Sequence, residues 1–327
     1  MTGGAGFIGS HLVDRLLAGG HEVRVIDNFK SGCLANLVQH SGNDALSIHD
    51  QDIVDNRLIA PIFEGVDWVF HLAAMADIVP SIQHPLIYHR ANVDGTISIL
   101  EAARNSGVKR FIYAASSSCY GVPDTYPTPE DAVAKPMYPY ALTKWIGEQY
   151  ALHWSQTYDL PVVSLRLFNV FGPRHRTNGT YGAVFGVFLA QKLAGEPYTV
   201  VGDGSQTRDF TFVSDIVDAF VMAASSNLKN EILNVGSDGT YSINKIVNLL
   251  GGETVFIPKR PGEPDCTWAD ISKIKRKLNW KPQMTLEDGV GEVLRHIDNW
   301  KGAPVWTPGS IMTATADWFK YLDKGHG

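Results

Sequence analysis

The first half of the chain alternates apolar, β-branched runs with helical patterns, and this alternation limits the fold more than any other feature. The runs predict strands over residues 21–27, 45–53, 67–74, 109–117 and 161–172. Helices are expected over residues 10–18, 92–106 and 139–158. Strands and helices in this order form an α/β fold with a doubly wound parallel sheet, which binds ligands at the carboxyl ends of its strands.

Beyond residue 172 the pattern becomes irregular, with helices expected over residues 181–194, 214–225, 243–250, 286–300 and 310–321. No linker or internal repeat separates the two parts, so a second lobe must be built from excursions of the first. We expect one domain over residues 1–172 with a return segment at about 209–236. A smaller, mostly C-terminal α/β lobe is expected over residues 173–208 and 237–327.

Spaced glycines stand at the start of the chain, where Gly3, Gly6 and Gly9 belong to the segment TGGAGFIG. Such glycines leave room where a tight turn, a pyrophosphate and a strand crowd the backbone, and the next helix directs its N-terminal amides at phosphates. An ordinary turn explains three glycines equally well. The strand that should precede the loop is not in the sequence, which suggests a late start. We therefore expect lost ladder hydrogen bonds and exposed apolar faces at the sheet centre.

An acidic residue, Asp27, ends an apolar run eighteen residues after Gly9. This is close to the spacing at which a carboxylate meets the ribose hydroxyls of a bound dinucleotide. A carboxylate would repel a ribose phosphate, so the pattern favours NAD over NADP. Asp52 and Ile53 end the next strand and could hold the adenine. Exposed turns at the two strand ends are the alternative reading.

Tyr140 and Lys144 stand four residues apart in the longest predicted helix, so their side chains share one face. A tyrosine needs a pKa about three units below its usual value of roughly 10 to act as a base near neutrality. A nearby ammonium and a positively charged nicotinamide both favour the phenolate. Taken alone, the pair also fits a surface cation beside a half-buried ring.

A serine cluster, in the segment AASSSCYG, ends the predicted strand over residues 109–117. A serine hydroxyl both donates and accepts, which suits an oxygen that passes between alcohol and ketone. Strand-end serines are commonly plain loop residues. However, the glycine loop, the acid, the serines and the Tyr/Lys pair follow one another in the order that the fold requires.

With these motifs the chain resembles the extended short-chain dehydrogenases/reductases, and most closely the UDP-hexose and UDP-N-acetylhexosamine 4-epimerases. The resemblance runs over nearly the whole length and implies a Rossmann sheet for NAD and a lobe for the nucleotide sugar. Tyr120-Gly121 places the family's catalytic serine or threonine at Ser116, with Ser117 and Ser118 as neighbours on the substrate side. Related dehydratases carry an Asp-Glu pair there and decarboxylases a Glu, so both serines favour epimerisation.

The resemblance also implies further binding residues. It assigns the sugar diphosphate to Asn169, in LFNVFG, and to two arginines, Arg208 in GSQTRD and Arg260 in RPGE, whose guanidinium forks suit phosphate oxygens. It places Thr267 beside the C2 substituent, where a threonine leaves room for an N-acetyl group. The residues that it assigns to the cofactor are Gly3, Gly6, Phe7, Ile8, Gly9, Asp27, Asn28, Asp52, Ile53, Leu72, Ala73, Ala74, Asn92, Tyr140 and Lys144.

The implied reaction is transient oxidation of the sugar to a 4-keto intermediate and return of the hydride to its other face. Two rivals remain: a dehydratase or decarboxylase on the same scaffold, and a non-catalytic NAD-sensing regulator. The regulator needs the glycine loop but not Tyr140 or Lys144. By resemblance, the chain is expected to form a homodimer through the helices near Asn92 and Tyr140, and to serve polysaccharide biosynthesis.

Charge and composition narrow the partners. A net charge of −6, with Lys and Arg scattered, gives no basic field for nucleic acid. No apolar stretch is long enough for a membrane span, and no signal segment is recognised. The three cysteines, Cys33, Cys119 and Cys266, lack metal-ligand spacing and favour a reducing compartment. We therefore expect a cytoplasmic enzyme without a metal site, a nucleic-acid partner or a membrane anchor.

Overall fold

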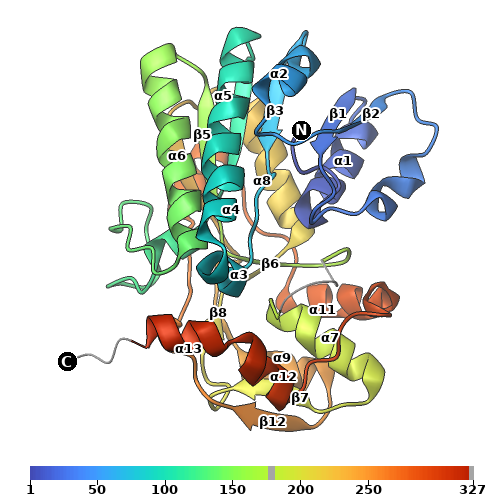
Figure 1. Ribbon diagram of the computed structural model, residues 1–327, viewed down its shortest axis with the longest axis vertical. Helices are drawn as coiled ribbons and strands as arrows, with labels where there is room; N and C mark the ends of the chain where they lie inside the picture. Colours follow the sequence, from blue (N-terminus) through green and yellow to red (C-terminus); the bar gives the residue numbers. More distant parts are fainter. Residues whose placement is uncertain (176–180, 324–327) are drawn as a thin grey trace.

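The computed structural model describes residues 1–175 and 181–323 and places two lobes one above the other (Figure 1). The upper lobe is built around a parallel sheet, and its strands are β1 (Val23–Asp27), β2 (Leu46–Asp50), β3 (Trp68–His71), β4 (Arg110–Ser116), β5 (Val162–Leu167) and β10 (Glu231–Val235). Its helices are α1 (Phe7–Ala18), α2 (Asn56–Ile59), α3 (Ile78–Gln83), α4 (Pro85–His89), α5 (Gly95–Asn105), α6 (Pro139–Tyr158) and α8 (Val213–Ser225). The predicted doubly wound α/β fold is confirmed.

Along the central strands, alternate residues enter separate cores on the two faces of the sheet. On β4, Ile112 packs with α1 and α8, whereas Phe111 and Tyr113 pack with α5 and α6. Both faces are therefore covered, and the carboxyl ends of the strands are left to face the second lobe (Figure 1).

The main-chain ladder at the sheet centre is broken as expected, except at one end: β1 pairs with β2, β3 belongs to a separate four-stranded ladder with β4, β5 and β10, and isolated bridges at Thr2 connect the two. Met1 and Thr2 lie between β1 and β3: the Met1 carbonyl accepts from the Ile26 amide at 2.8 Å, and the Thr2 amide donates to the Phe70 carbonyl at 3.0 Å. The Gly3 amide donates to the Ile26 carbonyl at 2.9 Å. Two residues therefore join β1 to β3 at their carboxyl ends only, directly before the glycine loop.

The lower lobe has its own apolar core, formed by short strands and helices. Its strands, with two that join the lobes, are β6 (Asn169–Phe171), β7 (Tyr198–Val201), β8 (Thr207–Arg208), β9 (Phe210–Phe212), β11 (Tyr241–Ser242) and β12 (Thr254–Ile257). Its helices, with α10 at the boundary, are α7 (Val184–Ala194), α9 (Ile243–Leu250), α10 (Ser272–Leu278), α11 (Leu286–Arg295), α12 (Pro308–Ala314) and α13 (Ala316–Leu322).

Three predicted elements are interrupted. The helix predicted over 286–300 ends as α11 at Arg295, and a short 3-10 helix over Ile297–Trp300 follows after His296. The strand predicted over 161–172 divides at Phe168, whose amide donates to the Val235 carbonyl at 3.1 Å, and the chain then leaves the main sheet to pair β6 with β9. The helix predicted over 310–321 divides at the buried Thr315 into α12 and α13.

Along the two described ranges, no helix combines the length and the apolar character needed to span a membrane. Within the same ranges, no group of three or more His, Cys, Asp or Glu side chains is arranged to hold a metal ion.

Candidate active site

A cavity of about 1090 Å³ runs from the glycine loop, along the carboxyl ends of the strands, into the lower lobe. Its position is the one at which doubly wound sheets bind ligands. The predicted site residues that line it are Gly3, Gly6, Phe7, Ile8, Gly9, Asp27, Asn28, Asp52, Ile53, Leu72, Ala73, Ala74, Ser116, Ser117, Ser118, Tyr140, Asn169, Arg208, Arg260 and Thr267.

The glycine loop leads into the twelve-residue helix α1, whose N-terminus suits a phosphate. Gly6 is the N-cap, no side chain caps the helix, and its first turn holds no acidic residue. The first amides of such a helix are free to donate to an anion, and the helix dipole favours one there. A Cβ on Gly3 would lie 2.7 Å from the backbone nitrogen of Ala73, so this glycine lets the loop meet the next strand end. The loop therefore fits the pyrophosphate of a dinucleotide.

Asp27 lies at the end of β1 and is 7% exposed. Its two carboxylate oxygens accept from the backbone amides of Ala5 and Phe29, each at 3.0 Å. Burial raises the pKa of Asp27, and these two hydrogen bonds oppose the rise. Each oxygen keeps a further lone pair, which suits ribose hydroxyls. The nearby Lys30 is paired with Asp52 at 3.1 Å, so this cation is already neutralised.

We predict that Gly9→Ala weakens NAD binding strongly. A Cβ at Gly9 would lie 2.1 Å from the Gly3 carbonyl oxygen and 2.9 Å from the Gly4 Cα. Because both are backbone atoms, the loop itself must shift, at a cost of about 1–3 kcal/mol. Gly291→Ala in α11 is the matched helical control, since its Cβ would meet nothing within 4 Å. Calorimetric titration with NAD measures both variants, and equal affinities would contradict the prediction.

Ser116 and Tyr140 meet at the centre of the cavity wall. Ser116 is the last residue of β4, and Tyr140 lies in the first turn of α6, where Pro139 begins the helix. Burial raises the pKa of Tyr140, and a hydrogen bond with the Ser116 hydroxyl opposes that rise. The Ser116 hydroxyl also lies 2.8 Å from that of Ser118. A phenol and a serine hydroxyl are thus presented together to anything bound in the cavity.

Lys144 lies one turn after Tyr140 on α6 and is buried. Its Nζ lies 4.4 Å from the centre of the Tyr113 ring. Burial lowers the pKa of Lys144 to about 7, and the charge of Glu148 opposes this fall. The protein by itself therefore does not lower the pKa of Tyr140, because burial outweighs the other influences on that phenol.

Two predicted residues do not line the cavity, namely Lys144 and Asn92. Asn92 is 1% exposed, and its amide exchanges hydrogen bonds with the backbone of Met75 at 2.8 and 3.0 Å. It also donates to the Thr143 hydroxyl at 3.0 Å. Asn92 thus fixes the loop after β3 against α6, directly behind the cavity wall.

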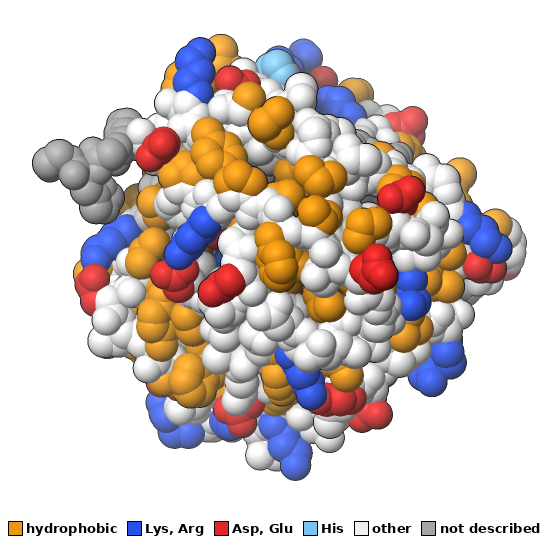
Figure 2. Space-filling model, turned by 90° about the horizontal axis from the view of Figure 1, so that it is seen from below, with side chains coloured by type: hydrophobic (Ala, Val, Ile, Leu, Met, Phe, Trp, Pro, Cys, Tyr) orange, Lys and Arg blue, Asp and Glu red, His pale blue; other side chains and the backbone are white. Residues whose placement is uncertain are grey.

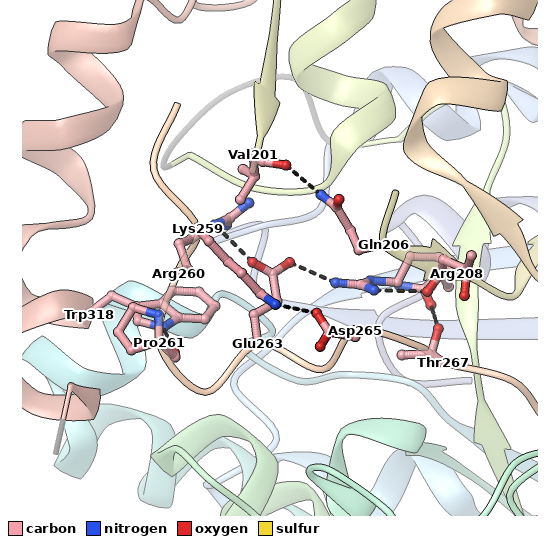
Figure 3. Close-up of polar contacts among 12 residues, drawn as sticks. Val201, Gln206, Arg208, Lys259, Arg260, Pro261, Glu263, Asp265, Thr267 and Trp318 are labelled. Carbon is pink, nitrogen blue, oxygen red and sulfur yellow. Dashed lines mark hydrogen bonds and ion pairs between the residues drawn. The ribbon is translucent and has the colours of Figure 1, made fainter. Parts of the chain in front are cut away.

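The lower end of the cavity carries two arginines that share one carboxylate (Figure 3). Arg208 Nη2 lies 2.9 Å from one oxygen of Glu263, and Arg260 Nε lies 3.1 Å from the other. Both guanidinium groups keep further N–H donors. This end therefore suits a ligand with several anionic oxygens.

Thr267 and Asn169 bridge the lobes beside this pair. The Thr267 hydroxyl donates to Asn169 Oδ1 at 2.8 Å and accepts from the Asp209 amide at 3.2 Å. Among the cavity side chains to which sequence reasoning assigned no role are Glu263, Tyr138 and Trp318. The first two lie in segments already singled out, next to Arg260 and Tyr140, whereas nothing local in the sequence marks Trp318.

Known proteins with similar sequences include NAD-dependent epimerases and related enzymes. A sequence profile described as "NAD dependent epimerase/dehydratase family" matches residues 1–236. The UDP-glucose 4-epimerase of Mycolicibacterium smegmatis is 37% identical over 307 residues, covering 91% of this chain and 98% of that protein. UDP-glucuronic acid decarboxylase 1 of Xenopus tropicalis is 34% identical and is covered over 71% of its length, with 91% of this chain.

Two solved structures are similar throughout. The UDP-N-acetylglucosamine 4-epimerase of Methanobrevibacter ruminantium, in complex with UDP-N-acetylmuramic acid, is 36% identical with a TM-score of 0.85, over 92% of this chain and 96% of that chain. The UDP-glucuronic acid 4-epimerase of Bacillus cereus, in complex with UDP-glucuronic acid and NAD, is 32% identical with a TM-score of 0.83, over 91% and 98%.

A parallel sheet, a glycine loop at its centre and a serine–tyrosine pair at its ligand-binding edge define a short-chain dehydrogenase/reductase. Within that class, the chain belongs to the NAD dependent epimerase/dehydratase family. The cofactor of this family is NAD, as the B. cereus structure illustrates.

Proposed function

We propose that the protein is an NAD-dependent UDP-sugar 4-epimerase, acting on UDP-glucose and UDP-N-acetylglucosamine. The observation that carries the proposal is the contact of Ser116 with Tyr140 on a cavity that also reaches the glycine loop and the Arg208–Arg260 pair. Such a cavity accommodates a dinucleotide at one end and a nucleotide diphosphate at the other. The sugar then lies between them, at the phenol.

In the proposed reaction, Tyr140 takes the proton of the sugar C4 hydroxyl and later returns it to the oxygen of the 4-keto sugar. Ser116 stabilises that oxygen by hydrogen bonding. The ammonium group of Lys144, one turn along α6, favours the phenolate form of Tyr140. When bound, NAD supplies the positive charge that lowers the pKa of Tyr140, and it accepts and returns the C4 hydride. Arg208 and Arg260 hold the diphosphate while the keto sugar turns about its linkage, which exposes its other face.

The serines favour this reaction over elimination. The cavity wall beside Tyr140 presents Ser117 and Ser118, neither of which is an acid that can protonate a departing hydroxyl. Incubation with a panel of UDP-sugars, followed by NMR, tests the proposal. We expect reversible interconversion of C4 epimers. Irreversible product formation would point to a dehydratase or decarboxylase, and NAD binding without turnover would point to a regulator.

Thr267 is proposed to admit an N-acetyl group at C2, so we predict that Thr267→Tyr selectively removes activity on UDP-N-acetylglucosamine. The larger ring would fill the space next to Asn169, whereas UDP-glucose lacks the group that clashes. We expect the ratio of the two kcat/KM values to change by about 10–200-fold. Thr267→Val is the control, because it loses the hydroxyl at nearly constant size. A wild type confined to UDP-glucose, with no gain in Thr267→Ala, would contradict the assignment.

The remaining expectations stand as parts of the same proposal. We assign NAD binding to residues 1–172 with the return segment at about 209–236, and nucleotide-sugar binding to 173–208 and 237–327. We also propose a cytoplasmic homodimer that serves polysaccharide biosynthesis. Helices α5 and α6 pack side by side on the outer face of the sheet (Figure 1), and α6 exposes the apolar side chains of Leu142 and Tyr158. Light scattering should give twice the chain mass of 35.9 kDa.

A further inference from the structure

The C-terminal segment over residues 303–322, here named the strap, crosses from the lower lobe to the upper one. At its start, the Trp306 carbonyl accepts from Gln191 Nε2 at 2.7 Å, and the Trp306 ring meets that of Tyr181 at 5.4 Å. At its far end, Asp317 accepts from Gln83 of α3 at 2.8 Å. Helix α13 accordingly lies directly below α3 (Figure 1). The strap lies outside the residues that the family profile matches.

The strap supplies part of the cavity wall, through Ala303, Pro304, Trp306 and Trp318. Trp318 is 4% exposed, and its indole N–H donates to the Pro261 carbonyl at 2.7 Å. Its ring centre is 5.3 Å from the guanidinium carbon of Arg260. Figure 3 shows the indole beside Arg260 and Pro261. One side chain of the strap therefore contacts both the backbone and the charge of the segment that carries Arg260.

Arg260 is placed between aromatic rings while its donors stay available. The Tyr181 ring centre lies 5.2 Å from its guanidinium carbon, a distance similar to that of Trp318. Rings near a guanidinium hold its plane by cation–π attraction and leave its edge free for phosphate oxygens. Within the described part of the chain, Arg260 Nε and Glu263 Oε2 are buried without a hydrogen bond of good geometry. Because Arg260 Nε faces Glu263 at 3.1 Å, an anionic ligand would be held by the remaining N–H donors of the guanidinium group.

We propose that the strap completes the diphosphate site, with Trp318 as a positioning residue that presents Arg260 to the ligand. This inference rests on the proposed function, because it takes the ligand of Arg260 to be a nucleotide diphosphate. Trp318 acts mainly on binding, since its indole contacts Arg260 and Pro261 at the diphosphate end, and on the side of the phenol it reaches only the ring of Tyr138.

The test uses the full chain loaded with NAD and measures UDP affinity by calorimetry, together with KM and kcat for the UDP-sugar. We expect Trp318→Ala to weaken UDP binding and raise KM by about tenfold or more, with kcat changed by less than about twofold. Trp318→Phe keeps a ring but loses the N–H donor, so its UDP affinity should lie between those of the wild type and of Trp318→Ala. Met312→Ala is the control, because Met312 belongs to the strap but is 71% exposed.

Figure 2 shows the end of the molecule that carries the strap, where hydrophobic side chains lie in small groups among charged ones. Because Met312 is exposed on the strap, its replacement by alanine should leave UDP affinity as in the wild type. Should Trp318→Ala fail to fold, Trp318→Phe decides, with an expected loss of about threefold or more in UDP affinity. Unchanged UDP affinity and KM in a folded Trp318 variant would overturn the inference.

The proposed function can fail separately. A wild type that binds UDP but turns over no UDP-sugar would overturn the epimerase proposal, and the Trp318 variants would still be judged by UDP affinity. A wild type that does not bind UDP at all would overturn both.

Discussion

Replacing Tyr140 with phenylalanine is expected to lower kcat/KM for a UDP-sugar by about 10²–10⁴-fold, the range usually lost with a general acid–base group. The variant lacks the one oxygen that can take the C4 hydroxyl proton while held by Ser116. Its ring still fills the same space, so the affinity for NAD should stay close to that of the wild type. Steady-state kinetics and NAD titration of the same preparation give both quantities.

Tyr138→Phe is the matched control for this prediction. Tyr138 also lines the cavity, and its ring stacks on that of Tyr140 with centres 6.4 Å apart. Its hydroxyl is hydrogen-bonded to Ser118, so its removal should cost less than about tenfold in kcat/KM. If Tyr140→Phe lost no more activity than Tyr138→Phe, Tyr140 would not be the base.

The second large effect concerns stability. Arg166 on β5 and Glu148 on α6 form a buried ion pair with an Nη2–Oε1 distance of 2.6 Å and exposed fractions of 5% and 1%. Ser164 also donates to this carboxylate, at 2.8 Å. Arg166→Met would leave a charged carboxylate buried without its main partner. We expect the free energy of unfolding to fall by about 3–5 kcal/mol.

Denaturant titration measures this free energy. Two further variants test whether the loss comes from the burial of an unpaired charge. Lys109→Met breaks an exposed pair with Asp67, whose side chains are 75% and 64% exposed, and should cost less than about 1 kcal/mol. The double variant Arg166→Met, Glu148→Leu removes both charges and should recover most of the loss. If Arg166→Met and Lys109→Met lost equal free energies of unfolding, the buried pair would contribute no more to stability than an exposed pair.

The stability of this pair also bears on the site. Glu148 lies one turn beyond Lys144, and its charge raises the pKa that burial lowers. The helix that carries Tyr140, Lys144 and Glu148 is thereby anchored to β5 by Arg166. The face of α6 that carries Tyr140 and Lys144 and the buried ion pair thus share one helix.

Local patterns predicted the elements whose periodicity is strong. Helices 139–158 and 243–250 agree with α6 and α9 residue for residue, because capping and apolar spacing set their ends. The division of the strand predicted over 161–172 escaped prediction, since it depends on the Phe168 amide pairing with Val235, far along the chain. Strands β7 and β12 were missed for a similar reason: each is four residues long and is defined by the other.

The residues of the candidate site also fall into those that local sequence marks and those that only the folded chain reveals. Gly3, Asp27, Ser116 and Tyr140 could be found from sequence, because each stands at a strand end or helix start that the fold directs to one edge. Glu263 and Trp318 could not. Their roles arise from contacts between segments that only the folded chain brings together, such as Arg208 with Glu263 and Trp318 with Pro261.

The central claim is that one hydride leaves C4 of the sugar and returns to the same carbon on its other face. UDP-glucose carrying deuterium at C4, incubated with the wild type in ordinary water and followed by NMR, measures this directly. The account predicts a mixture with UDP-galactose in which deuterium stays at C4 of both sugars. Loss of the label to solvent, or its transfer to another carbon in an irreversible product, would contradict it.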